Sequence, residues 1–239
     1  VEEDPRATDP ANIAAMGELI DQLEKKGHAY RSDGSIYFKI STMADYGKLA
    51  HLDHEGIKPG ARVDSDDYMK DDARDFVLWK ATSPGEPTWE VVGAPGRPGW
   101  HLECSAMALR LLGPSPIDIH TGGVDLIFPH HENEIAQSEC ATGHQFSRFW
   151  FHVEHLIVDE QKMSKSLGNT HIIPEIVKAG FRPSAVRFLL LSAHYRKQLN
   201  FTWESLTQAE EAMRRLVDCM TRVEGVTASG SHADTVARV

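Results

Sequence analysis

The sequence lacks paired cysteines, long apolar runs and an excess of positive charge. Its 239 residues contain three cysteines, Cys104, Cys140 and Cys219, with no CxxC pair, which argues against a disulfide framework and favours a metal ligand or a free thiol. The apolar stretches are far shorter than the roughly 18 residues that span a bilayer, and no charged-then-apolar signal opens the chain. We therefore expect a cytoplasmic protein without a membrane partner.

The charge balance excludes one broad class of nucleic-acid-binding proteins. The net charge of −10 argues against a general nucleic-acid coat protein, although a local basic groove for a tRNA can exist on an acidic chain. Hydrophobic residues make up 41% and charged residues 25%, as in ordinary globular proteins. The length allows one large domain or two smaller ones.

Helical and strand-like patterns alternate along the chain. Residues 9–27 have helical apolar spacing, with Pro10 in the first turn and Gly27 as a stop. Residues 29–40 are typical of a hairpin with its turn at Asp33-Gly34, and 41–98 predict an irregular α+β module.

In the second half of the chain, predicted strands and helices alternate as they do in an α/β layer. After Trp100 the patterns predict helix 101–112, a buried strand at 117–120, a turn at 122–123, helix 131–140 and strand 150–158. Ligands of parallel sheets lie at the carboxyl ends of the strands. Helices at 183–195 and after Thr202 follow, and we expect residues 225–239 to fray.

Three residues have the chemistry of a zinc site. His130 and Glu134 are four residues apart and share one helix face, and Cys104 lies near the start of an earlier helix, where the dipole favours a thiolate. Sulfur, nitrogen and oxygen ligands together suit zinc. Taken alone, such residues are also typical of a solvated surface or a core cysteine, and His131 or Glu132 could replace the preferred ligands.

A cationic loop follows a predicted strand at residues 162–169. Two lysines, Lys162 and Lys165, lie three residues apart, with hydroxyl side chains nearby and a glycine behind them. Such a loop can neutralise the charge that grows on a transferring phosphate and can close over a nucleotide. The alternative interpretation is an exposed basic turn.

Several strings together resemble cysteinyl-tRNA synthetases of the class I type. The strongest are GWHLECSAM at 99–107, DIH at 118–120, FPHHENE at 128–134 and the class signature KMSKS at 162–166. Weaker matches are PRAT at 5–8, YGKL at 46–49 and DFVLWK at 75–80. The resemblance covers roughly residues 5–223.

The resemblance implies an α/β fold with a split Rossmann-like parallel sheet. Residues 1–98 would form the connective α+β insertion and 99–170 the second Rossmann half with its signature loop. Residues 171–239 would form a helical stem-contact region and the start of a helical tRNA-binding domain. The implied reaction is ATP-dependent activation of L-cysteine and its transfer to tRNA(Cys), by a monomer.

The resemblance also assigns the site residues. Zinc would be held by Cys104, His130 and Glu134, together with a further cysteine of the family. The remaining assignments are cysteine contacts at Trp100, His120 and Asp125, and ATP contacts, with Mg²⁺, at Lys162, Met163, Ser164 and Lys165, the two lysines being catalytic.

The sequence departs from the family in its first half. The family's HIGH motif and first zinc cysteine have no counterpart, and the similar string at 51–54 lacks the glycine. Because the half with the HIGH motif and the first zinc cysteine is missing, we expect an amino-terminally truncated fragment that is inactive alone. Three alternatives stay open: a mycothiol-pathway ligase joining cysteine to glucosaminyl-inositol, a zinc hydrolase, and a non-catalytic remnant that binds tRNA or a partner.

Overall fold

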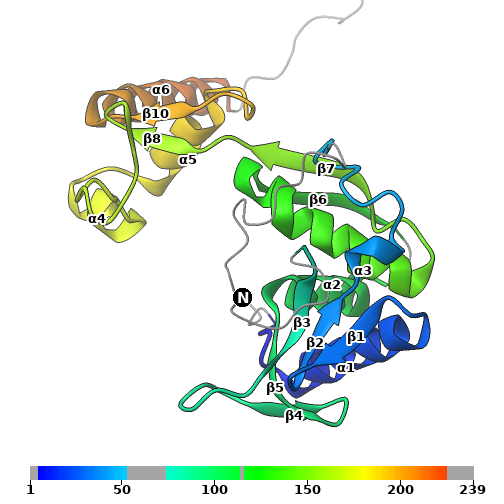
Figure 1. The fold of residues 1–239 in the computed structure, drawn as a ribbon. Coiled ribbons are helices and arrows are strands. Elements are labelled where there is room, and N and C mark those ends of the chain that lie inside the picture. Colours follow the sequence, from blue (N-terminus) through cyan, green and yellow to red (C-terminus); the bar gives the residue numbers. More distant parts are fainter. Residues whose placement is uncertain (1–4, 53–73, 114–115, 225–239) are drawn as a thin grey trace, which may run out of the picture. The chain divides into compact units, whose positions relative to one another are not determined.

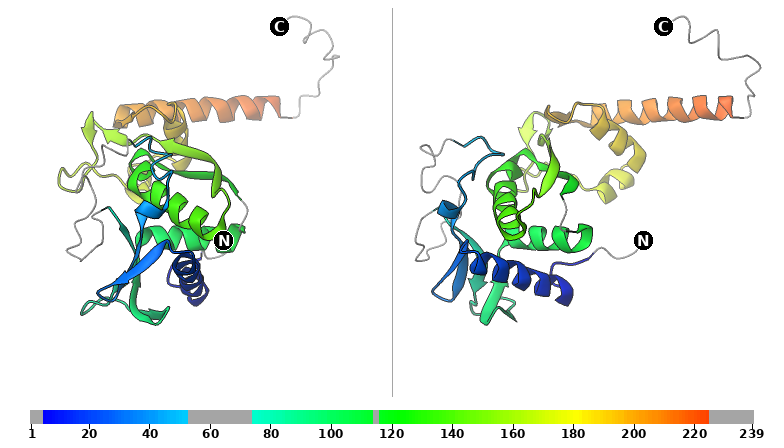
Figure 2. Two further views of the ribbon diagram at one scale, coloured as in Figure 1. Left: turned by 45° about the vertical axis from the view of Figure 1, so that its right-hand side comes forward. Right: turned by 90° about the vertical axis from the view of Figure 1, so that its right-hand side faces the viewer.

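The computed structural model describes residues 5–52, 74–113 and 116–224 (Figures 1 and 2). These residues form two compact units that divide between His152 and Val153. The predicted fraying at 225–239 and the last two residues of the HIGH-like string lie outside the described residues. No helix among the described residues is long and apolar enough to cross a membrane.

The first unit opens with the predicted helix, α1 (Pro10–Lys25). Asp9 precedes it in an extended conformation and Pro10 occupies the first turn, where its missing N–H costs nothing. Gly27 follows with a φ of +78°. The stripe from Ile13 to Leu23 is buried, so the helical period of the sequence correctly predicted the packed face.

An antiparallel sheet follows α1. Asp33 and Gly34 have φ values of +46° and +77°, which confirms the predicted tight turn. The strand order is β1-β2-β3-β5-β4. The strands are β1 (Ala29–Ser32), β2 (Ser35–Phe38), β3 (Phe76–Ala81), β4 (Trp89–Val91) and β5 (Ala94–Pro98), and a short 3₁₀ turn at Ile40–Thr42 follows β2.

The last strand of this sheet leads into α2 (Trp100–Leu112). The N–H of Gly99 donates to the carbonyl of Leu78 at 2.8 Å. A Cβ at Gly99 would overlap the carbonyl oxygen of Val77, so only glycine lets the strand and the helix start approach this closely. α2 packs against α1 and against α3 (Glu132–Thr142).

One apolar core joins these elements. It contains residues on both sides of position 98, such as Leu78 of β3 and Leu102 of α2. The predicted domain boundaries lie at 98 and 170, whereas the compact units divide at 152. The first unit therefore holds the expected insertion together with most of the expected Rossmann half.

Two strands of the first unit differ in detail from the prediction. β6 (Ile117–Gly123) is longer than expected and includes the glycines predicted as a turn; Ile119 is 62% exposed, so the strand is not buried. It pairs with β7 (Ser147–Val153). The predicted strand 150–158 is wrong as one element, because β8 (Leu156–Val158) is separate.

The second unit is a small α/β unit. β8 pairs in parallel with β10 (Leu199–Phe201) and antiparallel with β9 (Gln161–Lys162). Its helices are α4 (Ile173–Lys178), α5 (Pro183–Leu191) and α6 (Trp203–Val223). α5 is shorter than the predicted 183–195.

The helix α6 begins at a capping threonine and buries only the first part of its apolar face. The Thr202 hydroxyl accepts the N–H of Ser205 at 3.0 Å, as an N-cap should. Leu206 and Ala209 are buried, whereas Met220 is 70% exposed. The first turns of α6 therefore carry its contact with the core of the second unit.

Candidate metal centre and signature loop

The three predicted metal ligands come together in the first unit. Cys104 lies in the second turn of α2, His130 in the kinked segment Ile127–His131, and Glu134 in the first turn of α3. One ligand atom from each lies within 4.8 Å of the others. The chain therefore brings sulfur, nitrogen and oxygen to one point.

The distance between the nitrogen and the oxygen of this group suits two ligands of one ion. His130 Nε2 lies 3.6 Å from Glu134 Oε2, close to the edge of roughly 3.4 Å that metal–ligand bonds of about 2.1 Å give. Glu134 is fully buried, and within the described residues its Oε1 has no hydrogen-bond partner. A buried acceptor without a donor needs a cation or a proton, so this donor set fits zinc.

The thiol of Cys104 is protonated in the chain without metal, contrary to the expected thiolate. Burial, and then the charges of Glu134 and Glu103, raise its pKa to about 12. The predicted thiolate at a helix start is therefore wrong for the metal-free chain, because Cys104 is the fifth residue of α2, beyond the turn where the dipole acts. A bound cation reverses this balance and favours the thiolate.

Two further histidines contact the ligands. His101 Nδ1 lies 2.8 Å from His130 Nδ1, which leaves His130 Nε2 toward Glu134. Burial, and then His130, lower the pKa of His101 to about 3, so this imidazole is neutral. His120 Nε2 lies 2.9 Å from Glu134 Oε2. Such neighbours fix the ring orientation of a ligand.

A second group could also hold an ion. His120, His131 and Glu134 offer atoms within 4.8 Å of one another, and His131 Nδ1 lies 2.8 Å from His152 Nε2. Burial, and then the neighbouring histidines, lower the pKa of His131 to about 3. Both groups share Glu134, and the group with Cys104 is the one that selects zinc by softness. The sequence analysis missed His101 and His152, although His101 is part of a quoted string.

Glu132, considered as an alternative ligand, is engaged elsewhere. Its carboxylate accepts backbone N–H groups from Gly47, Leu49 and Ala50. It belongs to neither metal-capable group of the described residues. The preference for Glu134 is therefore supported by geometry.

Two of the three predicted cysteine contacts lie directly against the candidate metal ligands. The ring of Trp100, 58% exposed, lies 4.2 Å from the ring of His130, centroid to centroid. His120 touches Glu134. Asp125 lies in the 3₁₀ turn Val124–Leu126, directly after β6, with its carboxylate against Gly123.

The signature loop lies in the second unit and is held by its own polar contacts. Asn169 accepts the N–H of Ser164 at 2.8 Å and donates to the carbonyl of Lys162 at 3.1 Å. Met163 packs against the core of that unit. Lys162 and Lys165 are exposed, so both ammonium groups are available to an anion. Asn169 is a structural residue of this loop that the sequence analysis left without a role.

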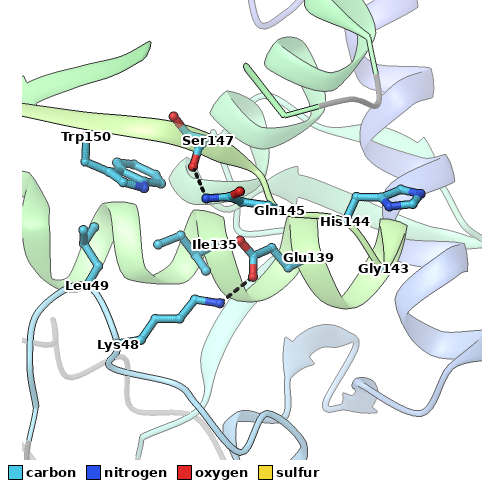
Figure 3. A pocket seen from close by; sticks show the side chains of 9 residues that line it. All are labelled: Lys48, Leu49, Ile135, Glu139, Gly143, His144, Gln145, Ser147 and Trp150. Atoms are coloured by element: carbon cyan, nitrogen blue, oxygen red, sulfur yellow. Dashed lines mark hydrogen bonds and ion pairs between the residues drawn. The ribbon is translucent and has the colours of Figure 1, made fainter. Parts of the chain in front are cut away.

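A cavity of about 570 Å³ lies on another side of α3 (Figure 3). Its lining includes Leu49, Ile135 and Trp150. Lys48 also lines it, but its ammonium group pairs with Glu139 and Asp45. No predicted site residue lines this cavity.

Comparison with known proteins identifies the family. Residues 2–211 match the family model described as "tRNA synthetases class I (C) catalytic domain". The cysteine–tRNA ligase of Solibacter usitatus is 53% identical over 224 residues, which are 93% of this chain and 48% of that protein. The Leptospira interrogans enzyme of the same name is 50% identical over 221 residues, 92% of this chain and 46% of that protein. The chain thus spans about half the length of the curated relatives it matches.

A solved structure supports the fold at lower sequence similarity. The Mycobacterium tuberculosis methionyl-tRNA synthetase, solved with methionyl-adenylate, matches with a TM-score of 0.65 at 18% identity, covering 98% of this chain and 58% of that one. The expected α/β fold of class I synthetases is confirmed.

Proposed function

Because the chain belongs to the class I (C) tRNA synthetase catalytic-domain family, we propose that the protein carrying it is a cysteine–tRNA ligase. It activates L-cysteine with ATP and transfers the cysteinyl group to tRNA(Cys). The single observation that carries the proposal is the meeting of Cys104, His130 and Glu134 within 4.8 Å. A thiol substrate is recognised best by the soft ion that such a group holds.

The metal centre sorts cysteine from serine. Zinc supplies a cation that binds a thiolate far better than a hydroxyl. Shape alone rejects such near-isosteres poorly. Cys104, His130 and Glu134, together with the further cysteine of the family, would hold the zinc ion, and the ion would supply a soft cation for the substrate sulfur. Trp100, His120 and Asp125 line the cysteine site.

The signature loop handles the phosphates. In the first step the cysteine carboxylate forms a bond to the α-phosphorus of Mg²⁺-bound ATP, and pyrophosphate leaves. Lys162 and Lys165 neutralise the charge that grows on the phosphates, while Met163 and Ser164 shape the ATP contact. In the second step the terminal ribose of tRNA takes the cysteinyl group and AMP leaves.

We assign the domains of the chain from the family resemblance. Residues 1–98 form the connective insertion, 99–170 the second Rossmann half with its loop, and 171–239 the helical region that contacts tRNA. The protein acts in the cytoplasm as a monomer.

The test compares amino acids and acceptors. We expect the zinc-loaded chain to bind cysteine but not serine in calorimetry, and removal of zinc should abolish the cysteine signal. The protein carrying the chain charges tRNA(Cys). Charging of glucosaminyl-inositol instead would establish the mycothiol-type ligase, and ATP-independent hydrolysis would establish the zinc hydrolase. Equal binding of serine would refute the sorting role.

A further inference from the structure

Glu132 is a buried carboxylate whose oxygens accept hydrogen bonds from backbone N–H groups of a distant loop. It is fully buried. Its Oε1 accepts the N–H of Gly47 at 2.8 Å, and its Oε2 accepts those of Leu49 at 3.0 Å and Ala50 at 2.9 Å. A buried anion needs such partners, and hydrogen bonds to a charged acceptor are stronger than neutral ones.

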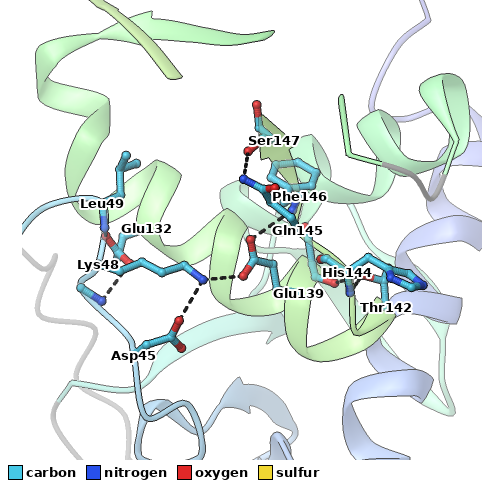
Figure 4. A network of polar contacts seen from close by, with 12 residues as sticks. Asp45, Lys48, Leu49, Glu132, Glu139, Thr142, His144, Gln145, Phe146 and Ser147 are labelled. Carbon is cyan, nitrogen blue, oxygen red and sulfur yellow. Dashed lines mark hydrogen bonds and ion pairs between the residues drawn. The ribbon is translucent and has the colours of Figure 1, made fainter. Parts of the chain in front are cut away.

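Residues 46–50, here called the clamp loop, make two more contacts with α3, of which the one between Lys48 and Glu139 is drawn in Figure 4. The Tyr46 hydroxyl donates to Asn133 Oδ1 at 2.6 Å in a buried position. Lys48 pairs with Glu139, two turns further along the helix. Gly47 has a φ of +96°, a conformation that glycine adopts readily. The clamp loop is therefore shaped to present its amides to α3.

The first turn of α3 is oriented by polar contacts more than by apolar packing. Of its first three residues, Glu132, Asn133 and Glu134, none is apolar and all are buried. Apolar burial has no directional preference, whereas a hydrogen bond weakens steeply as its angle departs from linear. The orientation of this turn about the helix axis is therefore set largely by the positions of the groups that donate hydrogen bonds to its carboxylates and its amide.

Glu132 lies between the two metal ligands of this turn. His130 precedes it by two residues and Glu134 follows it by two. The side chain of Glu132 faces the clamp loop. The side chains of His130 and Glu134, two residues away on either side, therefore face the other way, toward Cys104.

We propose that Glu132 is a positioning residue for the metal centre. By holding three amides of the clamp loop, it fixes the rotation of the first turn of α3, and with it the placement of His130 and Glu134 toward the ion and the thiol substrate. This inference rests on the proposed function and assigns to the insertion a part in the metal site.

The test uses the 239-residue chain loaded with Co²⁺. Chelator competition gives the metal affinity, visible absorption reports the ligand geometry, and amide hydrogen exchange reports the clamp loop. Glu132→Gln puts an NH₂ group against at least one N–H donor. We expect a metal dissociation constant about tenfold higher or more, an altered cobalt spectrum, and faster exchange at Gly47, Leu49 and Ala50.

Glu139→Gln is the matched control. It removes the same charge from the same helix and loosens Lys48 and the N–H of Phe146, yet it lies far along α3 from the ligands. Its metal affinity and spectrum should equal those of the unmodified chain. Glu132→Asp keeps the charge and should recover part of the affinity.

The outcomes separate the two proposals. Glu132→Gln with unchanged metal affinity and spectrum overturns the positioning role, as does an equal loss in Glu139→Gln. If Glu132→Gln does not fold, Ala50→Pro removes one donor without touching α3, and unchanged metal affinity in that variant refutes the role. If the unmodified chain shows no cobalt–thiolate absorption, the proposed metal centre itself fails.

Discussion

His130 Nε2 lies 3.6 Å from Glu134 Oε2, where the kinked segment Ile127–His131 passes into α3. The i, i+4 spacing in the sequence predicted that these side chains share a face. The third partner, Cys104, precedes His130 by more than twenty residues and lies on another helix. The candidate metal centre thus depends on the packing of α2 against α3 as much as on the local motif.

Removing one ligand should release the metal. We expect His130→Ala to lower zinc affinity by at least about tenfold and to lower cysteine affinity with it, because a ligand of the ion is lost. Zinc content after dialysis and cysteine titration by calorimetry measure both. His144→Ala, an exposed histidine beyond the end of α3, is the control and should keep its zinc. Unchanged zinc content in His130→Ala would remove His130 from the site.

Lys26 should stabilise the carboxyl end of α3. Its ammonium group donates to the carbonyls of Cys140 at 3.3 Å and Ala141 at 2.5 Å, groups at the negative end of the helix dipole. Lys26→Met should therefore lower the free energy of unfolding by about 1 kcal/mol, as measured by urea denaturation. The neighbouring Lys25→Met serves as the control, and equal losses in both variants would contradict the capping role.

Cys140 should react slowly at neutral pH. Burial, and then the charges of Asp45 and Glu139, raise its pKa from 9.0 to about 11. At pH 8 the thiolate fraction should be about a hundredfold lower in the folded chain than in the unfolded chain. Alkylation followed by peptide mapping, with and without urea, measures this ratio. Folding favours the protonated thiol, so its contribution to stability is present below pH 9 and is lost as the pH rises toward 11.

The exposed Cys219 provides the internal reference for that experiment. Its alkylation rate should change little when urea is added. Similar rates for Cys140 in the folded and unfolded chains would show that the thiol is not shielded as the structure indicates.

Lys165 should act on the chemical step. In the protein carrying this chain, Lys165→Ala should slow cysteine-dependent ATP–pyrophosphate exchange by about a hundredfold and leave cysteine binding nearly intact, because the lysine meets phosphate and not the thiol. Lys178→Ala, on α4 of the same unit, is the control. If cysteine binding collapses while the exchange rate holds, the role of the loop is wrong.

Local patterns predicted the elements well where one face was buried and both ends had clear signals. The helix α1 had Pro10 at its start, a stripe from Ile13 and Gly27 at its end, and the hairpin had Asp33-Gly34. The strand near Ile117 was harder, because an exposed Ile119 looks like a core residue in the sequence and only the fold shows its 62% exposure.

The residues of the candidate metal group could be predicted from the sequence, whereas the contacts that support them could not. Spacing predicted that His130 and Glu134 lie together, and the chemistry of a cysteine near a helix start added Cys104 before the resemblance did. No local rule could show that Glu132 captures amides of Gly47 and Ala50, more than eighty residues earlier, because that contact follows from tertiary packing. Nor could it show the raised pKa of Cys104, which burial beside Glu134 produces.

The most direct test of the account is the absorption spectrum of the Co²⁺-loaded chain during titration with cysteine and with serine. We predict a thiolate-to-cobalt band from Cys104 that is lost in Cys104→Ser, and a second increase in that band on adding cysteine but not serine. A spectrum without a thiolate band, or one that responds equally to both amino acids, would contradict the assignment of a thiol-selecting metal centre to these residues.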